Sequence, residues 1–129
     1  MSRVITVGAA QLGPIQRADD RAAVVARMIA LLDQAKGNGC DLVAFPELAL
    51  TTFFPRWFME DQADIDAFFE TSLPSAETAP LFETARRHGI AFTLGFAEKT
   101  EAGGRTRRFN TTVLFDKSGR EPTRYRKIH

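Results

Sequence analysis

The sequence predicts a layered α/β fold, because short apolar segments rich in β-branched residues alternate with helical patterns. The first three elements are a strand at residues 4–10, a helix at residues 20–36 and a strand at residues 41–45. A strand, a helix and a second strand within about 45 residues are typical of a βαβ unit with a right-handed crossover. The length of 129 residues leaves room for one domain with a sizeable core.

Each of these three elements has its own signature. The β-branched residues of segment 4–7 favour a pleated surface. Asp19 or Asp20 can cap the first turn of the helix. One apolar stripe runs along that helix and consists of Val25, Met28, Ile29 and Leu32. Residues 42–45 are apolar without alternation, which predicts a strand buried on both faces, and Pro46 ends it.

The rest of the chain continues the α/β pattern. We expect helices at residues 61–70 and 79–88, followed by strands at residues 90–97, 108–115 and 121–128. Turns at Gly103-Gly104 and at residues 116–119 separate these strands. Residues 48–58 have no helical period and are rich in aromatic residues, so this loop is expected to pack on the body or to line a pocket.

The composition excludes several classes of protein. Seventeen basic and sixteen acidic residues give a net charge of +1, which predicts no binding to nucleic acid or to anionic lipid. No segment approaches the roughly 20 apolar residues that span a bilayer. A single cysteine excludes an internal disulfide framework and a cysteine-cluster zinc site, and it fits a cytoplasmic protein. No histidine or carboxylate cluster has metal-ligand spacing, so no metal is expected.

Glu47 is the first candidate for chemistry. It follows a predicted buried strand, and the carboxyl ends of strands in open α/β sheets are where catalytic groups gather. Partial burial is expected to raise the pKa of its carboxyl and to suit it to general-base work. The alternative is an ordinary solvated glutamate at the end of a strand.

Lys127 is the second candidate, in the segment Tyr125-Arg126-Lys127-Ile128-His129. Its ammonium can stabilise a developing oxyanion if it points into a cleft. Alternatively, it protects an edge strand by positive charge together with Arg124 and Arg126. His129 is two residues further on and would share a strand face with Lys127.

Two other reactive residue types are expected to be structural. Cys40 lies at the start of the strand that ends at Glu47, roughly 15 Å away by the rise of a strand. The neighbouring Asp41 would raise the pKa of the Cys40 thiol, which argues against a nucleophile. His88 lies in the last turn of a predicted helix, where a cation complements the helix dipole.

Two short motifs, Phe45-Pro46-Glu47-Leu48 and Tyr125-Arg126-Lys127-Ile128-His129, have their glutamate and lysine 80 residues apart (127 minus 47). Together they resemble the glutamate and lysine signatures of the nitrilase, or carbon–nitrogen hydrolase, superfamily. The segment Phe109-Asn110-Thr111 is similar to part of the family's central hairpin. The resemblance implies an α-β-β-α sandwich. Residues 1–129 would form the N-terminal portion of a single such domain, truncated before the segment that bears the nucleophile.

Within the superfamily, the loop at residues 47–57 looks like that of the N-carbamoyl-D-amino acid amidohydrolases. The implied reaction converts a small N-carbamoyl-D-amino acid into the D-amino acid, carbon dioxide and ammonia, with no metal or organic cofactor. By resemblance, Glu47 is the general base, Lys127 stabilises the oxyanion and His129 lies near the substrate. Full-length relatives are expected to be homo-oligomers.

The resemblance also implies what this chain lacks. In the family, the catalytic cysteine follows the lysine motif, and Cys40 matches neither its position nor its context. The chain would therefore carry only the glutamate and lysine of a Glu-Lys-Cys triad, and we expect it to be inactive in isolation. The alternatives are another member of the superfamily, such as a β-ureidopropionase-like enzyme, an aliphatic amidase or a nitrilase, and a non-catalytic gene remnant or interaction fragment.

Overall fold

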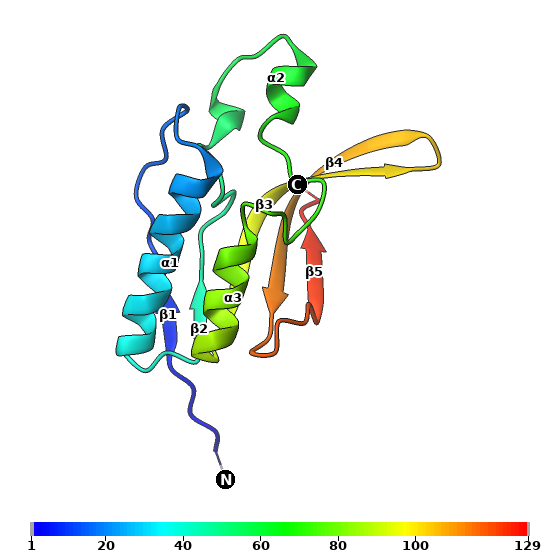
Figure 1. The fold of residues 1–129 in the computed structure, drawn as a ribbon. Helices are drawn as coiled ribbons and strands as arrows, with labels where there is room; N and C mark the ends of the chain where they lie inside the picture. Colours follow the sequence, from blue (N-terminus) through cyan, green and yellow to red (C-terminus); the bar gives the residue numbers. More distant parts are fainter. Residues whose placement is uncertain (1, 129) are drawn as a thin grey trace.

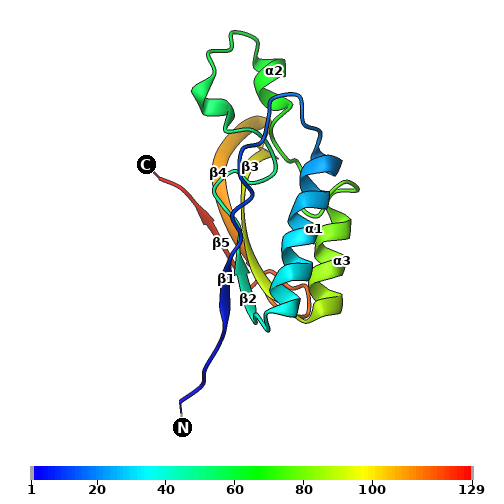
Figure 2. The same ribbon diagram turned by 90° about the vertical axis from the view of Figure 1, so that its left-hand side faces the viewer.

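The computed structural model describes residues 2–128, which form one five-stranded sheet with helices on one side (Figures 1 and 2). The strands, in chain order, are β1 (Val7–Ala9), β2 (Leu42–Ala44), β3 (Ala91–Ala102), β4 (Arg105–Phe115) and β5 (Thr123–Arg126). The helices are α1 (Arg21–Gly37), α2 (Gln62–Asp66) and α3 (Ala79–His88), with a single 3₁₀ turn, η1 (Phe54–Arg56).

The sheet follows the order of the chain, β1-β2-β3-β4-β5. The pairs β1–β2 and β2–β3 are parallel, and the pairs β3–β4 and β4–β5 are antiparallel. This confirms the α/β class and the parallel first pair. It is one sheet-and-helix half of the expected sandwich, because no helix covers the second face of the sheet among residues 2–128 (Figure 2).

The core lies between the sheet and the helices α1 and α3. Alternate residues of β3, namely Phe92, Leu94 and Phe96, are buried on the helix side of the sheet. Phe82 of α3 meets the ring of Phe92 at a centroid distance of 5.2 Å and that of Phe115 at 4.6 Å, both edge to face. Such aromatic pairs add to the free energy gained by burial. From α1 the core receives Val24, Val25, Met28, Leu32 and Ala35.

The opposite face of the sheet is open. Val7 in β1 is 54% exposed and Tyr125 in β5 is 59% exposed, although both are large and mainly apolar. In β2, Val43 is buried while Leu42 and Ala44 are only partly so. The prediction that this strand is buried on both faces was therefore wrong for the described part of the chain. Its continuous apolar run instead places apolar side chains on a face that no other element among residues 2–128 covers.

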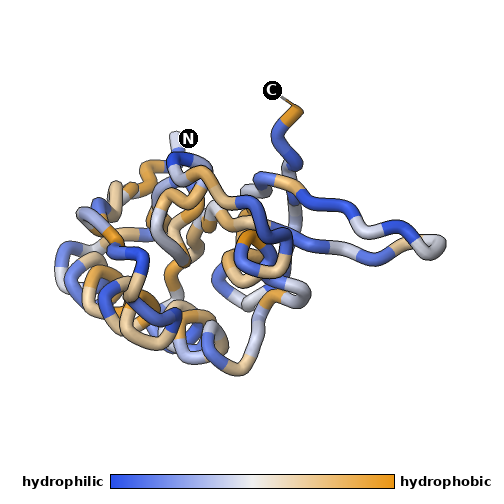
Figure 3. The backbone as a smooth tube through the Cα atoms, turned by 90° about the horizontal axis from the view of Figure 1, so that it is seen from above, coloured by the Kyte–Doolittle hydropathy of each residue, from blue (hydrophilic) through white to orange (hydrophobic). Residues whose placement is uncertain are grey.

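The hairpin of β3 and β4 is longer than the sequence predicted. The pairing runs from Phe92 opposite Phe115 to Ala102 opposite Arg105. Gly103 and Gly104 both have positive φ, as a two-residue type I′ turn requires, so the ladder continues to the turn. The far half of this hairpin projects from the body and is mostly hydrophilic (Figure 3). That polarity hid the strand from a pattern based on apolar residues.

The segment between β2 and α3 also departs from expectation. The helix predicted at residues 61–70 is only the five-residue α2, capped by Asp61, whose side chain accepts a bond from the amide of Ala63. Beyond it, Phe68 stacks on Phe54 at a centroid distance of 5.0 Å. The amide of Glu70 then donates to the carbonyl of Ala97. The chain leaves the helix because these later residues bond to the sheet and to the loop instead.

The boundaries of α1 and α3 are close to the predictions, whereas two strands differ from them. α3 spans the predicted residues 79–88 and ends at Gly89, which adopts the left-handed conformation. The side chain of Asp20 caps α1 by accepting from the amide of Ala23. β1 and β5 are shorter than the strands predicted at residues 4–10 and 121–128. Among residues 2–128, no helix is long and apolar enough to cross a membrane.

Candidate active site

The loop that begins after β2 holds Glu47 tightly against β3. The amide of Phe45 donates to the carbonyl of Thr93, and the amide of Ala49 donates to the carbonyl of Gly95. Gly95 makes this approach possible, because a Cβ at that position would lie 2.8 Å from the carbonyl oxygen of Pro46 and 3.0 Å from the Cα of Glu47. The glycine therefore fixes the place of the Glu47 backbone at the carboxyl end of β2.

Glu47 and Lys127 meet on the open face of the sheet. Nζ of Lys127 lies 3.0 Å from Oε1 of Glu47, although the two residues are 80 positions apart in the chain. Lys127 directly follows β5, and its amide donates to the carbonyl of Asn110 in β4. The antiparallel pairing of β4 with β5 brings the end of β5 back toward the loop after β2.

Asn110 completes the contact. Its Nδ2 donates to the same oxygen, Oε1 of Glu47, at 2.6 Å. Oε2 of Glu47 has no hydrogen-bond donor among residues 2–128, so one carboxylate oxygen is held and the other remains able to accept a proton. Asn110 was not among the site residues predicted from the sequence. The segment Phe109-Asn110-Thr111, which resembles part of the family's central hairpin, could have indicated Asn110 if the register of β4 had been known.

The pKa of the Glu47 carboxyl lies below its ordinary value, first because of the hydrogen bond from Lys127 and second because of that from Asn110. Burial raises this pKa, but it is the weaker influence, since the side chain is 48% exposed. The predicted rise in the pKa of Glu47 was therefore wrong. The two donors stabilise the charged carboxylate more than desolvation destabilises it.

An open hollow of about 390 Å³ lies beside this pair. Thr112 of β4 and Tyr125 of β5 line it together with Glu47. The full lining consists of Phe45, Pro46, Glu47, Asn110, Thr112, Tyr125 and Lys127. The hollow gives a small molecule access to both the carboxylate and the ammonium.

The remaining candidates lie elsewhere. His129 is outside the described residues. Cys40 precedes β2 while Glu47 follows it, so the two lie toward opposite ends of that strand, and Cys40 packs against the core. His88 contacts Asp33 of α1 through Nε2 at 2.6 Å, which ties α3 to α1. Within residues 2–128, no group of three histidine, cysteine or acidic residues could hold a metal ion.

Arg124 and Arg126 are not free charges that protect an edge. Both point to the helix side of the sheet and bind the buried carboxylate of Glu98, a residue that was not predicted from the sequence. No local pattern marks this contact, because Glu98 lies in β3 and reaches the arginines only through the pairing of β3, β4 and β5.

Comparison with known proteins gives consistent results. The model of the carbon–nitrogen hydrolase family matches residues 6–129. An aliphatic nitrilase of Rhodococcus rhodochrous is 31% identical over 116 residues, covering 84% of this chain and 31% of that protein. A nitrilase of Paraburkholderia phymatum is 29% identical over 132 residues, covering 98% of this chain and 37% of that protein.

Two solved structures share the fold. A carbon–nitrogen hydrolase from Helicobacter pylori G27 has a TM-score of 0.74 at 23% identity, over 97% of this chain and 40% of its own. Nit3 of Saccharomyces cerevisiae, from branch 10 of the nitrilase superfamily, has a TM-score of 0.74 at 19% identity, over 97% and 44%.

The fold is thus that of the nitrilase superfamily. The match of the family model over nearly all of the sequence makes the assignment more specific: the chain belongs to the carbon–nitrogen hydrolase family. The chain spans less than half the length of each relative described above.

Proposed function

We propose that this chain supplies the general base and the oxyanion-stabilising cation of an enzyme that hydrolyses a carbon–nitrogen bond in a small molecule. The contact of Glu47 with Lys127 beside an open hollow supports this most directly. Residues 1–129 would be the N-terminal portion of a single hydrolase domain, with the same arrangement in the whole protein.

In this proposal, Glu47 takes the proton of a cysteine thiol through its free oxygen, Oε2. The resulting thiolate attacks the carbonyl carbon of the substrate, and the ammonium of Lys127 stabilises the negative charge that develops on the carbonyl oxygen. Glu47 then returns the proton to the departing ammonia, and water hydrolyses the thioester. A carboxylate whose pKa lies below its ordinary value is ionised at neutral pH, as the first step requires.

The thiol in this scheme is not Cys40, because that residue lies toward the other end of β2. A cysteine nucleophile is supported by the solved amidase from Nesterenkonia sp. AN1, in which acrylamide adds to an active-site cysteine. The nucleophile of this protein would be a cysteine beyond residue 129. The 129-residue chain is therefore expected to show no turnover by itself.

We propose an N-carbamoyl-D-amino acid as the substrate. The resemblance of the loop at residues 47–57 to that of the N-carbamoyl-D-amino acid amidohydrolases supports this choice. In the structure, Phe53 and Trp57 of this loop are exposed, and none of Phe53, Arg56 and Trp57 lines the hollow beside Glu47. Loss of ammonia from this substrate leaves a carbamoyl thioester, and its hydrolysis releases an N-carboxy amino acid that loses carbon dioxide. The expected products are therefore the D-amino acid, carbon dioxide and ammonia.

A nitrile is the second candidate substrate. It is favoured by the relatives, since those from Rhodococcus rhodochrous and Paraburkholderia phymatum are nitrilases. The same glutamate, lysine and cysteine would then act on a carbon–nitrogen triple bond. The two candidates differ in the substrate and not in the residues that this chain contributes.

Release of ammonia decides between these substrates. We would test the 129-residue chain and, where the reading frame continues past codon 129, the whole gene product, with N-carbamoyl-D- and L-amino acids, amides and nitriles. Ammonia from the D-carbamoyl substrate supports the proposal, with Glu47→Gln and Lys127→Met each removing activity. Ammonia from nitriles alone overturns the carbamoyl assignment. Turnover by the 129-residue chain that Cys40→Ala abolishes overturns the placement of the nucleophile.

A further inference from the structure

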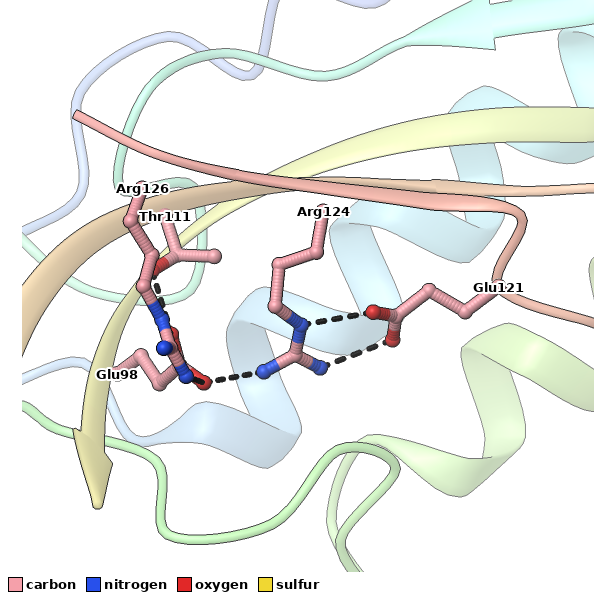
Figure 4. Close-up of polar contacts among 5 residues, drawn as sticks. All are labelled: Glu98, Thr111, Glu121, Arg124 and Arg126. Atoms are coloured by element: carbon pink, nitrogen blue, oxygen red, sulfur yellow. Dashed lines mark hydrogen bonds and ion pairs between the residues drawn. The ribbon is translucent and has the colours of Figure 1, made fainter.

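A second cluster of charges, shown in Figure 4, lies on the helix side of the sheet, which is the face opposite the candidate active site. Its centre is Glu98 in β3, whose side chain is only 5% exposed. Arg126 donates to it twice, from Nε to Oε2 at 2.8 Å and from Nη2 to Oε1 at 2.9 Å. Thr111 of β4 donates from Oγ1 to Oε2 at 2.8 Å. Arg124 also donates to Oε1, so Glu98 connects three strands of the sheet.

The Glu98 carboxyl is ionised in this cluster. The hydrogen bonds from Arg126 outweigh burial and lower the pKa of Glu98 to about 2. The guanidinium of Arg126 also lies 4.3 Å from the centroid of the Phe109 ring. A planar guanidinium held by two parallel bonds and a ring has little rotational freedom. The side chain of Arg126 is thus held in one position against β3 and β4.

Arg126 directly precedes Lys127 in the chain. Successive side chains of a strand point to opposite faces of the sheet, so Arg126 on the helix side puts Lys127 on the open side. In register, Arg126 pairs with Thr111, and the amide of Lys127 bonds to the carbonyl of Asn110. These contacts set how far along the sheet the ammonium lies, and it is within 3.0 Å of Glu47.

β5 has few other anchors. It is four residues long, it lies at the edge of the sheet, and all four of its residues are exposed. Burial of apolar surface therefore does little to hold this strand, and its position depends on its ladder with β4 and on its arginine side chains. Of these arginines, Arg126 adjoins Lys127, while Arg124 is shared between Glu98 and Glu121.

We propose that Glu98 is a positioning residue: from the helix side of the sheet it fixes the end of β5 through Arg126, so that Lys127 meets Glu47 on the opposite face. The inference rests on the proposed function only for the roles of Glu47 and Lys127. The contact between Glu47 and Lys127 that it explains is observed in the structure and does not depend on catalytic turnover.

The test reads the Glu47–Lys127 contact directly, by a carbon-13 NMR titration of the Glu47 carboxyl in the 129-residue chain. Glu98→Gln removes the charge that holds Arg126, so Lys127 loses its fixed position and the pKa of Glu47 shifts upward. Lys127→Met gives the full upward shift for comparison. A general loss of stability would not move the pKa of Glu47 in the folded protein, which separates positioning from a merely structural role.

Glu121→Gln is the matched control. It makes the same chemical change in the same cluster, but Glu121 binds Arg124 and not Arg126. It is expected to leave the pKa of Glu47 at its wild-type value. Circular dichroism confirms that each variant is folded. If Glu98→Gln does not fold, Arg126→Gln replaces it, since that side chain is 44% exposed and Arg124 still pairs with Glu98 when it is lost.

The inference is overturned if folded Glu98→Gln or folded Arg126→Gln titrates Glu47 as the wild type does. It is also overturned if Glu121→Gln shifts the pKa of Glu47 as far as Glu98→Gln does. These outcomes are independent of the proposed function: absence of carbon–nitrogen hydrolysis in the whole gene product would reject that function and leave the titration result standing.

Discussion

Two donors, the ammonium of Lys127 and the amide of Asn110, reach the same oxygen of Glu47. Lys127→Met and Asn110→Ala are each expected to raise the pKa of the Glu47 carboxyl toward its ordinary value. Lys127→Met has the larger effect, because the Lys127 hydrogen bond is the first cause of the lowered pKa. A carboxyl-detected NMR titration measures both shifts, and equal titration curves for all three proteins would contradict the expectation.

The same pair contributes little to stability. Its lowered pKa means that the stabilisation is present above the unfolded-state pKa of Glu47 and is lost as the pH falls through the folded-state value. Both side chains are about half exposed, so Lys127→Met is expected to cost at most about 1 kcal/mol of unfolding free energy. Urea unfolding at pH 7 measures this cost. A much larger loss would mean that the pair is structural.

Gly95 sets the position of the Glu47 backbone. In Gly95→Ala, the new Cβ meets backbone atoms of Pro46 and Glu47, which cannot rotate away as a side chain could. The expected loss of unfolding free energy is about 1–3 kcal/mol, as for overpacking in a core, together with a displaced Glu47. Urea unfolding measures the loss of unfolding free energy. A changed pKa of Glu47 in the NMR titration indicates that its carboxyl has been displaced.

Gly37→Ala is the control for this change. Gly37 is the last residue of α1, and a Cβ there would meet no heavy atom within 4 Å apart from its chain neighbours and the backbone of its own helix. Alanine is a better helix former than glycine, so a gain of up to about 1 kcal/mol is expected. If Gly95→Ala kept the unfolding free energy as well as Gly37→Ala does, the Glu47 backbone would not pack as closely on β3 as described here.

The sequence could predict Glu47 and Lys127 as candidates, because each lies in a distinctive motif and Glu47 also follows a predicted strand. It could not predict Glu98, whose partners depend on which residues of β3, β4 and β5 lie opposite one another. Strand register is a property of the folded sheet, and a shift of one residue would move Arg126 to the other face. Whether the pKa of Glu47 is raised or lowered depends on the same register, because the register places both hydrogen-bond donors, Lys127 and Asn110, at its carboxylate.

At the scale of elements, β5 shows why charge matters to this fold. Its side chains bury little surface, and Glu98 binds two of its arginines from β3. The helices behave differently, because α1 and α3 are held by apolar packing that their sequence periodicity already indicates. Their boundaries were therefore predicted closely, while those of β1, α2 and the β3–β4 hairpin were not.

The Glu98 cluster predicts a pH dependence of stability. The pKa of Glu98 falls from 4.5 to about 2 on folding, so its contribution is present above about pH 4.5 and is lost as the pH falls toward 2. A fall of this size corresponds to on the order of 3 kcal/mol. Glu98→Gln is expected to be less stable than the wild type at pH 6, and the difference should shrink progressively toward pH 2.

Urea unfolding at a series of pH values from 6 to 2 measures that difference, with Glu60→Gln as the control for the change in net charge. Glu60 is exposed and has no ion pair within residues 2–128. A constant difference between wild type and Glu98→Gln at every pH would show that Glu98 acts by shape and not by charge.

At the scale of the whole molecule, the sheet has one covered and one open face (Figure 2). The open face carries the candidate active site and also an apolar hollow of about 420 Å³. Ile5, Leu42, Ala91 and Leu114 are among the residues that line it. The Glu47–Lys127 pair thus lies on the same face of the sheet as a hollow lined by partly exposed apolar side chains.

This surface leads to an expectation for the 129-residue chain in solution. Ile5 is 50% exposed, Val7 is 54% exposed, and β1 is an edge strand, so association of chains through this region removes apolar area from water and pairs free backbone groups. The chain is expected to self-associate as its concentration rises from micromolar to millimolar, measured by sedimentation velocity.

The double variant Ile5→Lys, Val7→Lys is expected to weaken that association by at least about tenfold in dissociation constant, because lysines on an edge strand and just before it repel a second copy and keep water at the surface. Ala26→Lys with Ala30→Lys adds the same charge on exposed positions of α1, on the covered side of the sheet. This control should associate as the wild type does. Equal weakening by both double variants would assign the effect to net charge, and a wild type that stays monomeric throughout would show that the open face is compatible with water as it stands.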